Sequence, residues 1–354
     1  MKSEIKNILL LKHYGIGIGD VVRSTASWRS IKEQIPGVRV HIFFWPHKTP
    51  SAAEYIMYHS EYLDSVHIIQ RDQVKRWWGR YTPLRSFKKA FELLRQVAEL
   101  EQVDLVIDQE LHGIDNAILS VWFRLKKIKT IGISQYPLKC LFYSFCSDND
   151  RVYAKKNKTS YPLDYTDKDY VALDCLGIWR DGQKISISPR PIGSDVAVWL
   201  GVASMLVGIN IGCGGDVEVA KRPAISLYVN IINSLIRRYD CDMILTGTAE
   251  ESWLNEGILK SLSDVARPRV KNLAGKTNME DLLGVITSCK CFISSDSGPF
   301  HLAVALEVPA IGLFNWPNPA CYHVNSITEN IVLGSVDDLS NVLSAFERIV
   351  TVAV

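Results

Sequence analysis

Short apolar runs alternate with longer amphipathic segments along most of this chain, and that alternation constrains the fold more than any other feature. The runs NILLLKH, RVHIFFW, VDLVIDQ and TIGIS have the length of strands, and helical patterns such as STASWRSIKEQI separate them. A second series of the same kind starts at SMLVGINIG and continues through CDMILTGT, CFISSD and AIGLF. Strands that alternate with helices build parallel sheets, so the sequence predicts an α/β protein with two open, doubly wound halves.

A polar stretch, WRDGQKISISPRPIGSD, separates the two series and is typical of an interdomain connection. The length of 354 residues also fits two domains better than one. We predict an N-terminal Rossmann-like domain over residues 1–180, a C-terminal Rossmann-like domain over 181–335 and a terminal helix over 336–354, for which packing on the first domain is one possibility. Ligands of such sheets bind at the carboxyl ends of the strands, so the two domains are expected to face each other across a ligand-binding cleft.

The composition excludes several classes of protein. A formal net charge of +2, with 47% hydrophobic and 22% charged residues, argues against a nucleic-acid binder with a broad basic face. The eight cysteines include no C-x-x-C pair, so neither a zinc site nor a disulfide framework is indicated. The first apolar run is too short for a signal peptide, and glycines interrupt the uncharged stretch 196–213. We therefore expect a cytoplasmic protein with reduced thiols and no transmembrane helix.

The loop after the first strand, KHYGIGIGDVV, carries alternating glycines but is not a dinucleotide-binding fingerprint. A G-x-G-x-x-G motif that starts at Gly15 needs glycine where Asp20 stands, and one that starts at Gly17 needs glycine where Val22 stands. A carboxylate at this place would also repel phosphates. Asp20 therefore has two interpretations: it caps the following helix, or it serves as a general base in the cleft.

Two loops of the second half offer groups that suit an anion. NIGCGGDVEVAKRP brings glycine-freed amides close to Lys221 and Arg222, which suits a diphosphate, although Lys-Arg-Pro before a helix is also ordinary surface chemistry. In SSDSGPFHLAVALEVPAIGLF a strand ends at Asp296 and a helix starts near Pro299, so the amides of a positive helix end can receive an anion. His301, in the first turn, points either to the ligand or into the packing.

The segment RDQVKRWWGRYTPLRSFKKAFELLR interleaves basic and aromatic residues. Such chemistry suits an anionic, lipid-linked saccharide or the headgroup layer of a membrane. A solvated helix face with a few packed tryptophans has the same composition, so both interpretations stay open.

Together these motifs resemble the heptosyltransferases, family 9 of the glycosyltransferases. LLLKHYGIGIGDVVRS and SSDSGPFHLAVALEVPAIGLF carry the likeness, the second through D-S-G-x-x-H-L-A followed by V-P-x-I-x-L-F. VDLVIDQELHG, YVALDCLGI and INIGCGGDVEVAKRP resemble further family segments, which extends the likeness over most of the chain. The sequence departs from the family pattern in a longer spacing from Lys12 to Asp20, in the lack of a tryptophan after Arg222 and in Gly-Cys-Gly where the family has Pro-Gly-Ala.

The resemblance implies a GT-B fold and inverting sugar transfer without a cofactor or a metal. The first domain would bind the acceptor, with Asp20 as the catalytic base, and the second would bind the nucleotide sugar, ADP-linked heptose above all. The donor-binding residues are expected to be Asn210, Gly212, Gly214, Lys221, Arg222, Thr246, Asp296, Ser297, Gly298 and His301. The acceptor-binding residues are expected to be Gly17, Gly19, Arg76, Trp77, Arg80 and Lys88.

The sequence thus predicts a cytoplasmic enzyme, peripheral on the inner membrane, that transfers a sugar to a lipopolysaccharide core or a related surface glycan. Its expected partners are the nucleotide-sugar donor, a lipid-linked or oligosaccharide acceptor and the inner-membrane surface, and nucleic acid is not among them. Two alternatives stay open because a fold does not fix a function. They are a nucleotide-sugar epimerase or hydrolase of the same fold and a catalytically silent nucleotide-sugar-binding protein.

Overall fold

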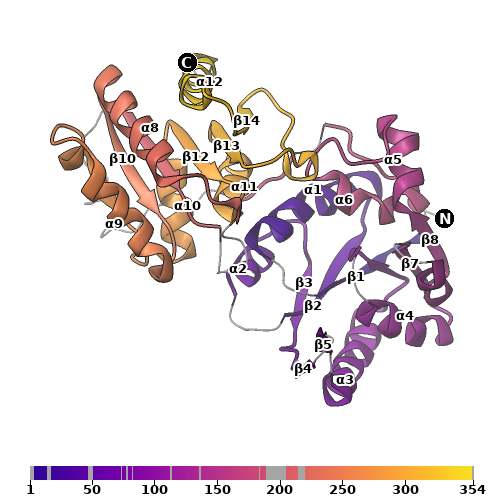
Figure 1. Cartoon of the computed structure of the whole chain (residues 1–354). Coiled ribbons are helices and arrows are strands. Elements are labelled where there is room, and N and C mark those ends of the chain that lie inside the picture. The colour runs from indigo at the N-terminus through magenta and orange to yellow at the C-terminus, as the bar shows by residue number, and fades with distance from the viewer. Residues whose placement is uncertain are drawn as a thin grey trace. The chain divides into compact units, whose positions relative to one another are not determined.

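The computed structural model describes residues 4–13, 17–46, 51–72, 74–76, 79–81, 83–111, 114–134, 137–182, 184–188, 205–213 and 220–352. The chain divides into two compact units, Met1–Ile185 and Ser186–Val354. Each unit contains a sheet with helices packed on it (Figure 1).

The first unit contains two sheets and six described α-helices. Its strands are β1 (Asn7–His13), β2 (Arg39–Trp45), β3 (Ser65–Ile68), β4 (Val74–Arg76), β5 (Gly79–Tyr81), β6 (Leu105–Asp108), β7 (Lys129–Ser134) and β8 (Phe145–Asp148). Its helices are α1 (Ile18–Gln34), α2 (Ala52–Tyr58), α3 (Leu84–Leu100), α4 (Asp115–Leu125), α5 (Asn149–Asn157) and α6 (Asp167–Tyr170), with the 3-10 helices η2 (Pro137–Phe142) and η3 (Ala172–Leu176).

The main sheet of the first unit has six parallel strands in the order β3-β2-β1-β6-β7-β8. Strand β1 lies in the middle, where Ile8 pairs with Val40 of β2 on one side and with Leu105 of β6 on the other. The direction in which strands are added reverses between β1 and β6. Such a switch point leaves room for a ligand at the carboxyl ends of the two strands.

The second unit contains one described sheet. Its strands are β9 (Met205–Asn210), β10 (Cys241–Thr246), β11 (Val270–Asn272), β12 (Cys291–Ser295), β13 (Ala310–Phe314) and β14 (Thr328–Val332). Its described helices are α8 (Ile225–Arg238), α9 (Ser252–Ser261), α10 (Met279–Thr287), α11 (Gly298–Ala305) and α12 (Asp338–Val352), with the 3-10 helices η5 (Ala249–Glu251), η6 (Arg267–Arg269) and η7 (Pro319–Cys321).

The second sheet repeats the topology of the first. Its six parallel strands run in the order β11-β10-β9-β12-β13-β14, and Val207 of β9 pairs with Met243 of β10 and with Cys291 of β12. Both sheets therefore have the 3-2-1-4-5-6 strand order of a doubly wound fold. The predicted α/β class and the two Rossmann-like halves are confirmed.

Helices cover the first sheet on both faces. Leu9 of β1 packs in one cluster with Leu94 of α3 and Phe123 of α4. Leu10, which the alternation of a strand places on the opposite face, is equally buried. Because both faces are apolar, polar side chains with a chemical role are expected where the strands end.

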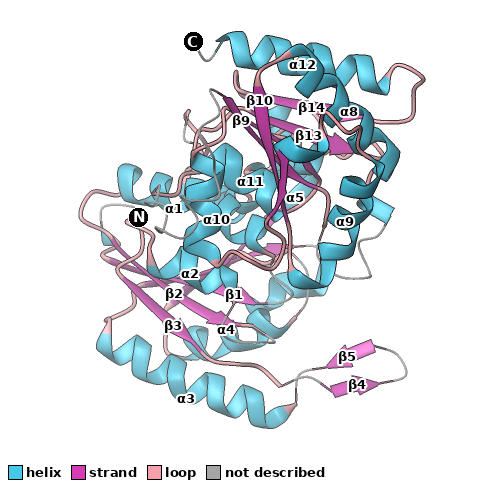
Figure 2. Cartoon of the chain, turned by 90° about the vertical axis from the view of Figure 1, so that its left-hand side faces the viewer, coloured by secondary structure: helices cyan, strands magenta, loops and turns pink. Residues whose placement is uncertain are grey.

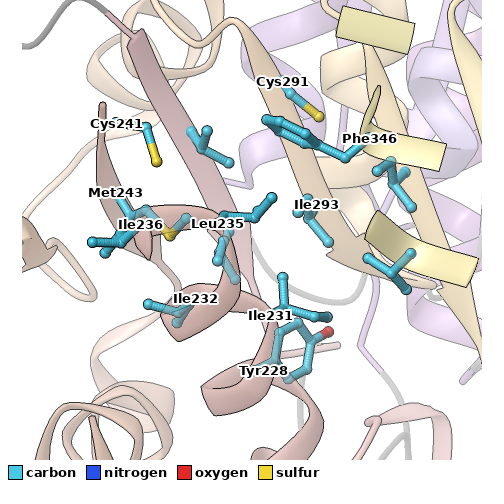
Figure 3. Packing of buried hydrophobic residues seen from close by; sticks show 14 of the residues in the cluster. Tyr228, Ile231, Ile232, Leu235, Ile236, Cys241, Met243, Cys291, Ile293 and Phe346 are labelled. Carbon is cyan, nitrogen blue, oxygen red and sulfur yellow. The ribbon is translucent and has the colours of Figure 1, made fainter. Parts of the chain in front are cut away.

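The terminal helix α12 belongs to the core of the second unit. Val342 and Phe346 are fully buried, in one cluster with Tyr228 of α8 and with Cys291 and Ile293 of β12 (Figure 3). The buried side of α12 thus lies against the second unit.

A small hairpin stands apart from the main sheet of the first unit. Strands β4 and β5 pair antiparallel, with Arg76 opposite Gly79 and Lys75 opposite Arg80. The hairpin follows the carboxyl end of β3 and projects from the body of the unit (Figure 2). Its basic residues are therefore carried on the carboxyl edge of the sheet.

The cysteines are free thiols, and several are core residues. Cys241, Cys289 and Cys291 are buried in the second unit, and burial raises the pKa of Cys289 to about 12, so this thiol is not a nucleophile at neutral pH. Of the uncharged stretch 196–213, residues 205–210 form β9, while 196–204 lie outside the described residues. In the described ranges, no helix is both long and apolar enough to cross a membrane.

The substitution Phe346→Ala should lower the free energy of unfolding by about 3–5 kcal/mol, because it removes a buried ring from the contact between α12 and the sheet. The measurement is urea denaturation of the whole chain, monitored by circular dichroism. Ser344→Ala is the control, because Ser344 is exposed on the same helix and its loss should change stability by no more than about 0.5 kcal/mol. If both variants changed the free energy of unfolding by the same small amount, the packing of α12 against the sheet would be contradicted.

Candidate functional site

The switch points of the two sheets gather most of the polar residues that the sequence singled out. In the second unit the ends of β9, β10 and β12 carry Asn210, Thr246 and Asp296. In the first unit Asp20 lies in the first turn of α1, directly after β1. The two sets are described separately below, because they belong to different units.

A hydrogen-bond network joins the strand ends of the second unit. The side-chain amide of Asn210 donates to the carbonyl oxygen of Gly212 at 2.7 Å and to Oγ of Ser297 at 3.0 Å. Oγ1 of Thr246 donates to Oδ1 of Asn210 at 3.2 Å, and Oγ of Ser295 donates to the carbonyl oxygen of Gly212 at 2.8 Å. These buried bonds connect three strand ends and fix Gly212, which lies directly after β9.

Helix α11 starts directly after this network. Ser297 is its N-cap residue in an extended conformation (φ −153°, ψ 166°), and Gly298 and Pro299 form the first turn, close to the predicted start. No side chain caps the helix. The backbone amides of Ser297 and Gly298 lie at the positive end of the helix dipole and so suit an anion.

Two cations border this helix start, and each is paired. Nζ of Lys221 lies 3.5 Å from Oδ2 of Asp296, and the guanidinium of Arg222 lies 3.6 Å from the carboxylate of Glu251. The Lys221 side chain is 29% exposed, so its pair with Asp296 is partly screened by water. An incoming anion with two or more charges can compete for this ammonium.

A small pocket opens beside Lys221 at the ends of β12 and β13. Its lining residues are Lys221, Asp296, Phe314, Asn315, Trp316 and Asn318. The side-chain amide of Asn315 donates to the carbonyl oxygens of Ala220 and Arg222 at 2.6 and 3.1 Å, which fixes the backbone that carries Lys221. Sequence reasoning missed Asn315 and Trp316, although both directly follow β13 and so share an edge with Asp296.

His301 is a packing residue within the second unit. It is buried, its Nδ1 lies 2.8 Å from Nε2 of His323, and the ring of Phe300 stacks at an angle against both imidazoles. The two interpretations of His301 were contact with a ligand and packing. The observed contacts are those of packing.

Asp20 is not the N-cap of α1. Gly17 occupies that position, and α1 has no side-chain cap bond, so the capping interpretation of Asp20 is wrong. The carboxylate of Asp20 accepts from the guanidinium of Arg23 at 2.8 Å and from the hydroxyl of Tyr165 at 3.4 Å. Its side chain is 43% exposed, so water or a substrate hydroxyl can reach it. Gly19 is buried in the same turn.

A fully buried carboxylate, Asp169, lies beneath Asp20 and was missed by the sequence reasoning. It accepts from Nε of Arg23 at 3.1 Å and from Oγ of Ser24 at 2.7 Å, and Nζ of Lys12 lies 3.6 Å away. Burial alone would raise the pKa of Asp169, but Arg23 and Lys12 lower it. Burial alone would lower the pKa of Arg23, because it disfavours the charged guanidinium. The carboxylates of Asp169 and Asp20 have the larger combined effect, so the pKa of Arg23 is raised. Arg23 thus bridges the two acids.

Glu110, which follows β6, completes this charged cluster. Its carboxyl group lies 4.0 Å from Nζ of Lys12, and burial raises its pKa to about 8. At neutral pH Glu110 therefore carries a proton, and the charges of Lys12 and Arg23 are balanced by Asp20 and Asp169. The spacing of Arg23 three residues after Asp20 on one helix was a signal for their contact. The more distant partners left no such signal.

The predicted acceptor-binding residues lie on different elements of the first unit. Arg76 and Arg80 lie on β4 and β5, and the structure describes their backbone only. Lys88 is exposed on α3, 4.0 Å from Glu92. Trp77 of the acceptor set and Gly214 of the donor set lie outside the described residues.

Because the pKa of Glu110 in the folded chain lies above its value of 4.5 in the unfolded chain, protonated Glu110 stabilises the fold. This stability is complete below pH about 4.5 and is lost as the pH rises through about 8. We expect the difference in free energy of unfolding between the wild type and Glu110→Gln to fall steadily from pH 5 to pH 8.5 in urea titrations. Asp169, with its lowered pKa, acts in the opposite sense in both proteins and cancels in the difference. A difference that does not change with pH would contradict the raised pKa.

Gly212→Ala should destabilise the second unit by about 1–3 kcal/mol. A Cβ at this position would overlap the carboxylate of Glu251, which cannot move without losing its bonds from the amide and the hydroxyl of Thr248, both at 3.3 Å. The matched control is Gly257→Ala in α9, where the nearest atom lies at 3.8 Å and alanine should stabilise the helix by about 0.5–1 kcal/mol. Compared with the wild type, Gly212→Ala should therefore unfold at a lower temperature and a lower urea concentration, and Gly257→Ala at higher ones. A Gly212→Ala variant as stable as the wild type would rule out the close approach of Glu251 to Gly212.

The sequence of the second unit matches a known family. Residues 212–340 match the family model "Glycosyltransferase family 9 (heptosyltransferase)". The lipopolysaccharide heptosyltransferase 2 of Salmonella typhimurium is 30% identical over 106 residues, which cover 30% of this chain and 30% of that protein. The aligned region thus spans less than a third of that relative's length.

Solved structures resemble the chain over nearly its whole length. The glycosyl transferase family 9 protein of Veillonella parvula superposes with a TM-score of 0.71 at 16% identity and covers 99% of both chains. The E. coli heptosyltransferase WaaC with ADP superposes with a TM-score of 0.62 at 16% identity, covering 98% of this chain and 99% of that one. At such identities the likeness concerns the fold, and it confirms the expected GT-B fold. Residues 212–340 are thus similar to glycosyltransferase family 9, and part of the chain is similar in sequence to a lipopolysaccharide heptosyltransferase.

Proposed function

We propose that this protein is an inverting glycosyltransferase that transfers heptose from ADP-heptose to a lipopolysaccharide core or a related surface glycan. The observation that carries the proposal is the uncapped start of α11 beside Lys221, within the segment that matches the heptosyltransferase family model. The similar proteins include a lipopolysaccharide heptosyltransferase and a heptosyltransferase with ADP, which supports the choice of donor and acceptor.

The second unit would bind the nucleotide sugar. A diphosphate at the start of α11 would accept from the amides of Ser297 and Gly298 and would draw Lys221 away from Asp296. Arg222 lies next to Lys221 in the chain and adds positive charge. The leaving nucleoside diphosphate gains negative charge as the glycosidic bond breaks, so these groups stabilise the transition state more than the bound donor.

Asp20 would act as the general base. The acceptor hydroxyl attacks the anomeric carbon from the face opposite the diphosphate, its proton moves to the carboxylate of Asp20, and the bonding electrons leave with the diphosphate. Attack from the opposite face inverts the anomeric configuration. Arg23 donates to the Asp20 carboxylate at 2.8 Å and to the buried Asp169 at 3.1 Å. These bonds orient the base before the acceptor binds.

The first unit would also bind the acceptor. Arg76 and Arg80 on the hairpin β4–β5 follow the carboxyl end of β3, on the edge of the sheet at which β1 leads to Asp20. Exposed Lys88 and Lys89 on α3 add positive charge to the same unit. Basic side chains of this kind suit the phosphates of a lipid-linked saccharide at the cytoplasmic face of the inner membrane.

Asp20→Asn should lower the rate of sugar transfer by about 10²–10⁴-fold, because it removes the proton acceptor and keeps the shape of the side chain. The control is Glu33→Gln, which should leave the rate unchanged. Both carboxylates lie on α1, both are 43% exposed, and each pairs with an arginine of the same helix. The assay measures ADP release and glycosylated product with purified lipopolysaccharide core acceptors. Full activity of Asp20→Asn would disprove the role of Asp20 as base.

The same assay separates the proposal from the alternatives. ADP-heptose that is consumed equally fast without acceptor would indicate a hydrolase or an epimerase. Saturable binding of ADP-heptose without turnover on any acceptor would indicate a silent binding protein. Only turnover that requires an acceptor agrees with the transferase.

A further inference from the structure

Two histidines and a glutamate converge at the amino-terminal half of the first sheet, away from the strand ends that carry Asp20 and Glu110. His41 lies on β2, His67 lies on the adjacent edge strand β3, and Glu101 caps the carboxyl end of α3. One ligand atom from each of the three side chains lies within 4.8 Å of the other two. Among the described residues this is the cluster of histidine, cysteine and acidic side chains that has the spacing of a metal site.

The two separations between the imidazole nitrogens and the carboxylate oxygens are close to those of a tetrahedral site. Nδ1 of His41 lies 3.5 Å from Oε2 of Glu101, and Nε2 of His67 lies 3.7 Å from Oε1 of Glu101. Around a zinc ion with bonds of about 2.0–2.1 Å, ligand atoms lie about 3.4 Å apart. Oγ of Ser65 lies at hydrogen-bond distances of 2.8 Å from Nδ1 of His41 and 2.7 Å from Nε2 of His67, so a hydroxyl borders the cluster between the two imidazoles.

Two of the three side chains lie in the interior of the first unit. His41 is fully buried and Glu101 nearly so, so a bound ion would be shielded from water. Nε2 of His41 is buried without a hydrogen-bond partner in the described residues. The polar contacts of this ring are therefore made through Nδ1, the atom that faces Ser65 and Glu101.

The cation that now faces Glu101 is exchangeable. Arg39 donates to Oε2 of Glu101 at 3.1 Å, but its side chain is 55% exposed and can turn into water. His67 is also partly exposed, which leaves a path from solvent to the cluster. A divalent ion can thus replace the guanidinium as the partner of the buried carboxylate.

We propose that His41, His67 and Glu101 form a structural binding site for a first-row divalent metal ion, of which Zn²⁺ is the best fit. Two imidazole nitrogens and one carboxylate suit zinc, cobalt or nickel, whereas Mg²⁺ and Ca²⁺ prefer oxygen ligands. Ser65 or a water molecule supplies the fourth ligand. The ion joins β2, the edge strand β3 and the end of α3, and it is separate from the proposed sugar transfer.

The rival explanation is a metal-free hydrogen-bonded cluster. In that arrangement Nδ1–H of His41 donates to Ser65, and the Ser65 hydroxyl donates to Nε2 of His67. Arg39 then remains the partner of Glu101. The two explanations differ in whether the purified chain binds one divalent ion and gains stability from it.

The test uses the full chain, stripped with a chelator and dialysed, and titrated with ZnCl₂ by calorimetry and with CoCl₂ by visible absorption. We expect one equivalent of zinc to bind and to raise the melting temperature of the chain. One equivalent of cobalt should bind at the same site and give the intense visible absorption of tetrahedral Co²⁺. His67→Ala should weaken binding by at least about tenfold and remove the thermal shift. The control is His59→Ala, because His59 is exposed at the end of α2 and should leave binding unchanged.

Glu101→Gln provides a second test if His67→Ala folds poorly, since it keeps the shape of the side chain and removes the charge that favours a metal. Weaker zinc binding in this variant supports the site. The proposal is overturned if the wild-type chain binds no zinc, or if both variants bind it as tightly as the wild type. None of these measurements depends on sugar transfer, so a failed metal site and a failed transferase assignment remain distinguishable.

Discussion

A parallel sheet that helices cover on both faces places most of its chemically active polar side chains where its strands end, and this constraint organises both units. In β1 the neighbours Leu9 and Leu10 are buried on opposite faces. In β9 the apolar run stops at Asn210, whose amide then connects to Gly212 and Ser297. Because both sheets have the same strand order, each unit has one switch point at which such ends lie side by side.

The two switch points hold their charges in different ways. Lys12 and Arg23 are buried in the first unit and tied to the buried Asp169, so neither is available to a phosphate. Lys221 in the second unit pairs with Asp296 at 3.5 Å and is 29% exposed, and Arg222 next to it pairs with Glu251 at 3.6 Å. A charge-balanced cluster suits an uncharged sugar hydroxyl, and exchangeable cations suit a diphosphate. This difference supports the proposed division into an acceptor unit and a donor unit.

The sequence predicted those features that have local signals. Alternating apolar runs predicted the strands, and the proline after Ser297 and Gly298 predicted the start of α11 to within a residue. Contacts between distant segments left no local signal. Asp169 lies 146 residues from Arg23, and His41, His67 and Glu101 belong to no spacing motif because the fold alone brings them together. The basic segment predicted a charged surface, but not that Arg76 and Arg80 would lie on a hairpin.

Helix α12 closes the core of the second unit from the far end of the chain. During synthesis β9, β10, β12 and β13 are made before residues 338–352, so the face that will receive Phe346 stays uncovered until α12 has formed. Such a face can associate with other apolar surfaces until its own helix arrives. The core of the second unit is therefore complete only once residues 338–352 have been made and have packed on the sheet.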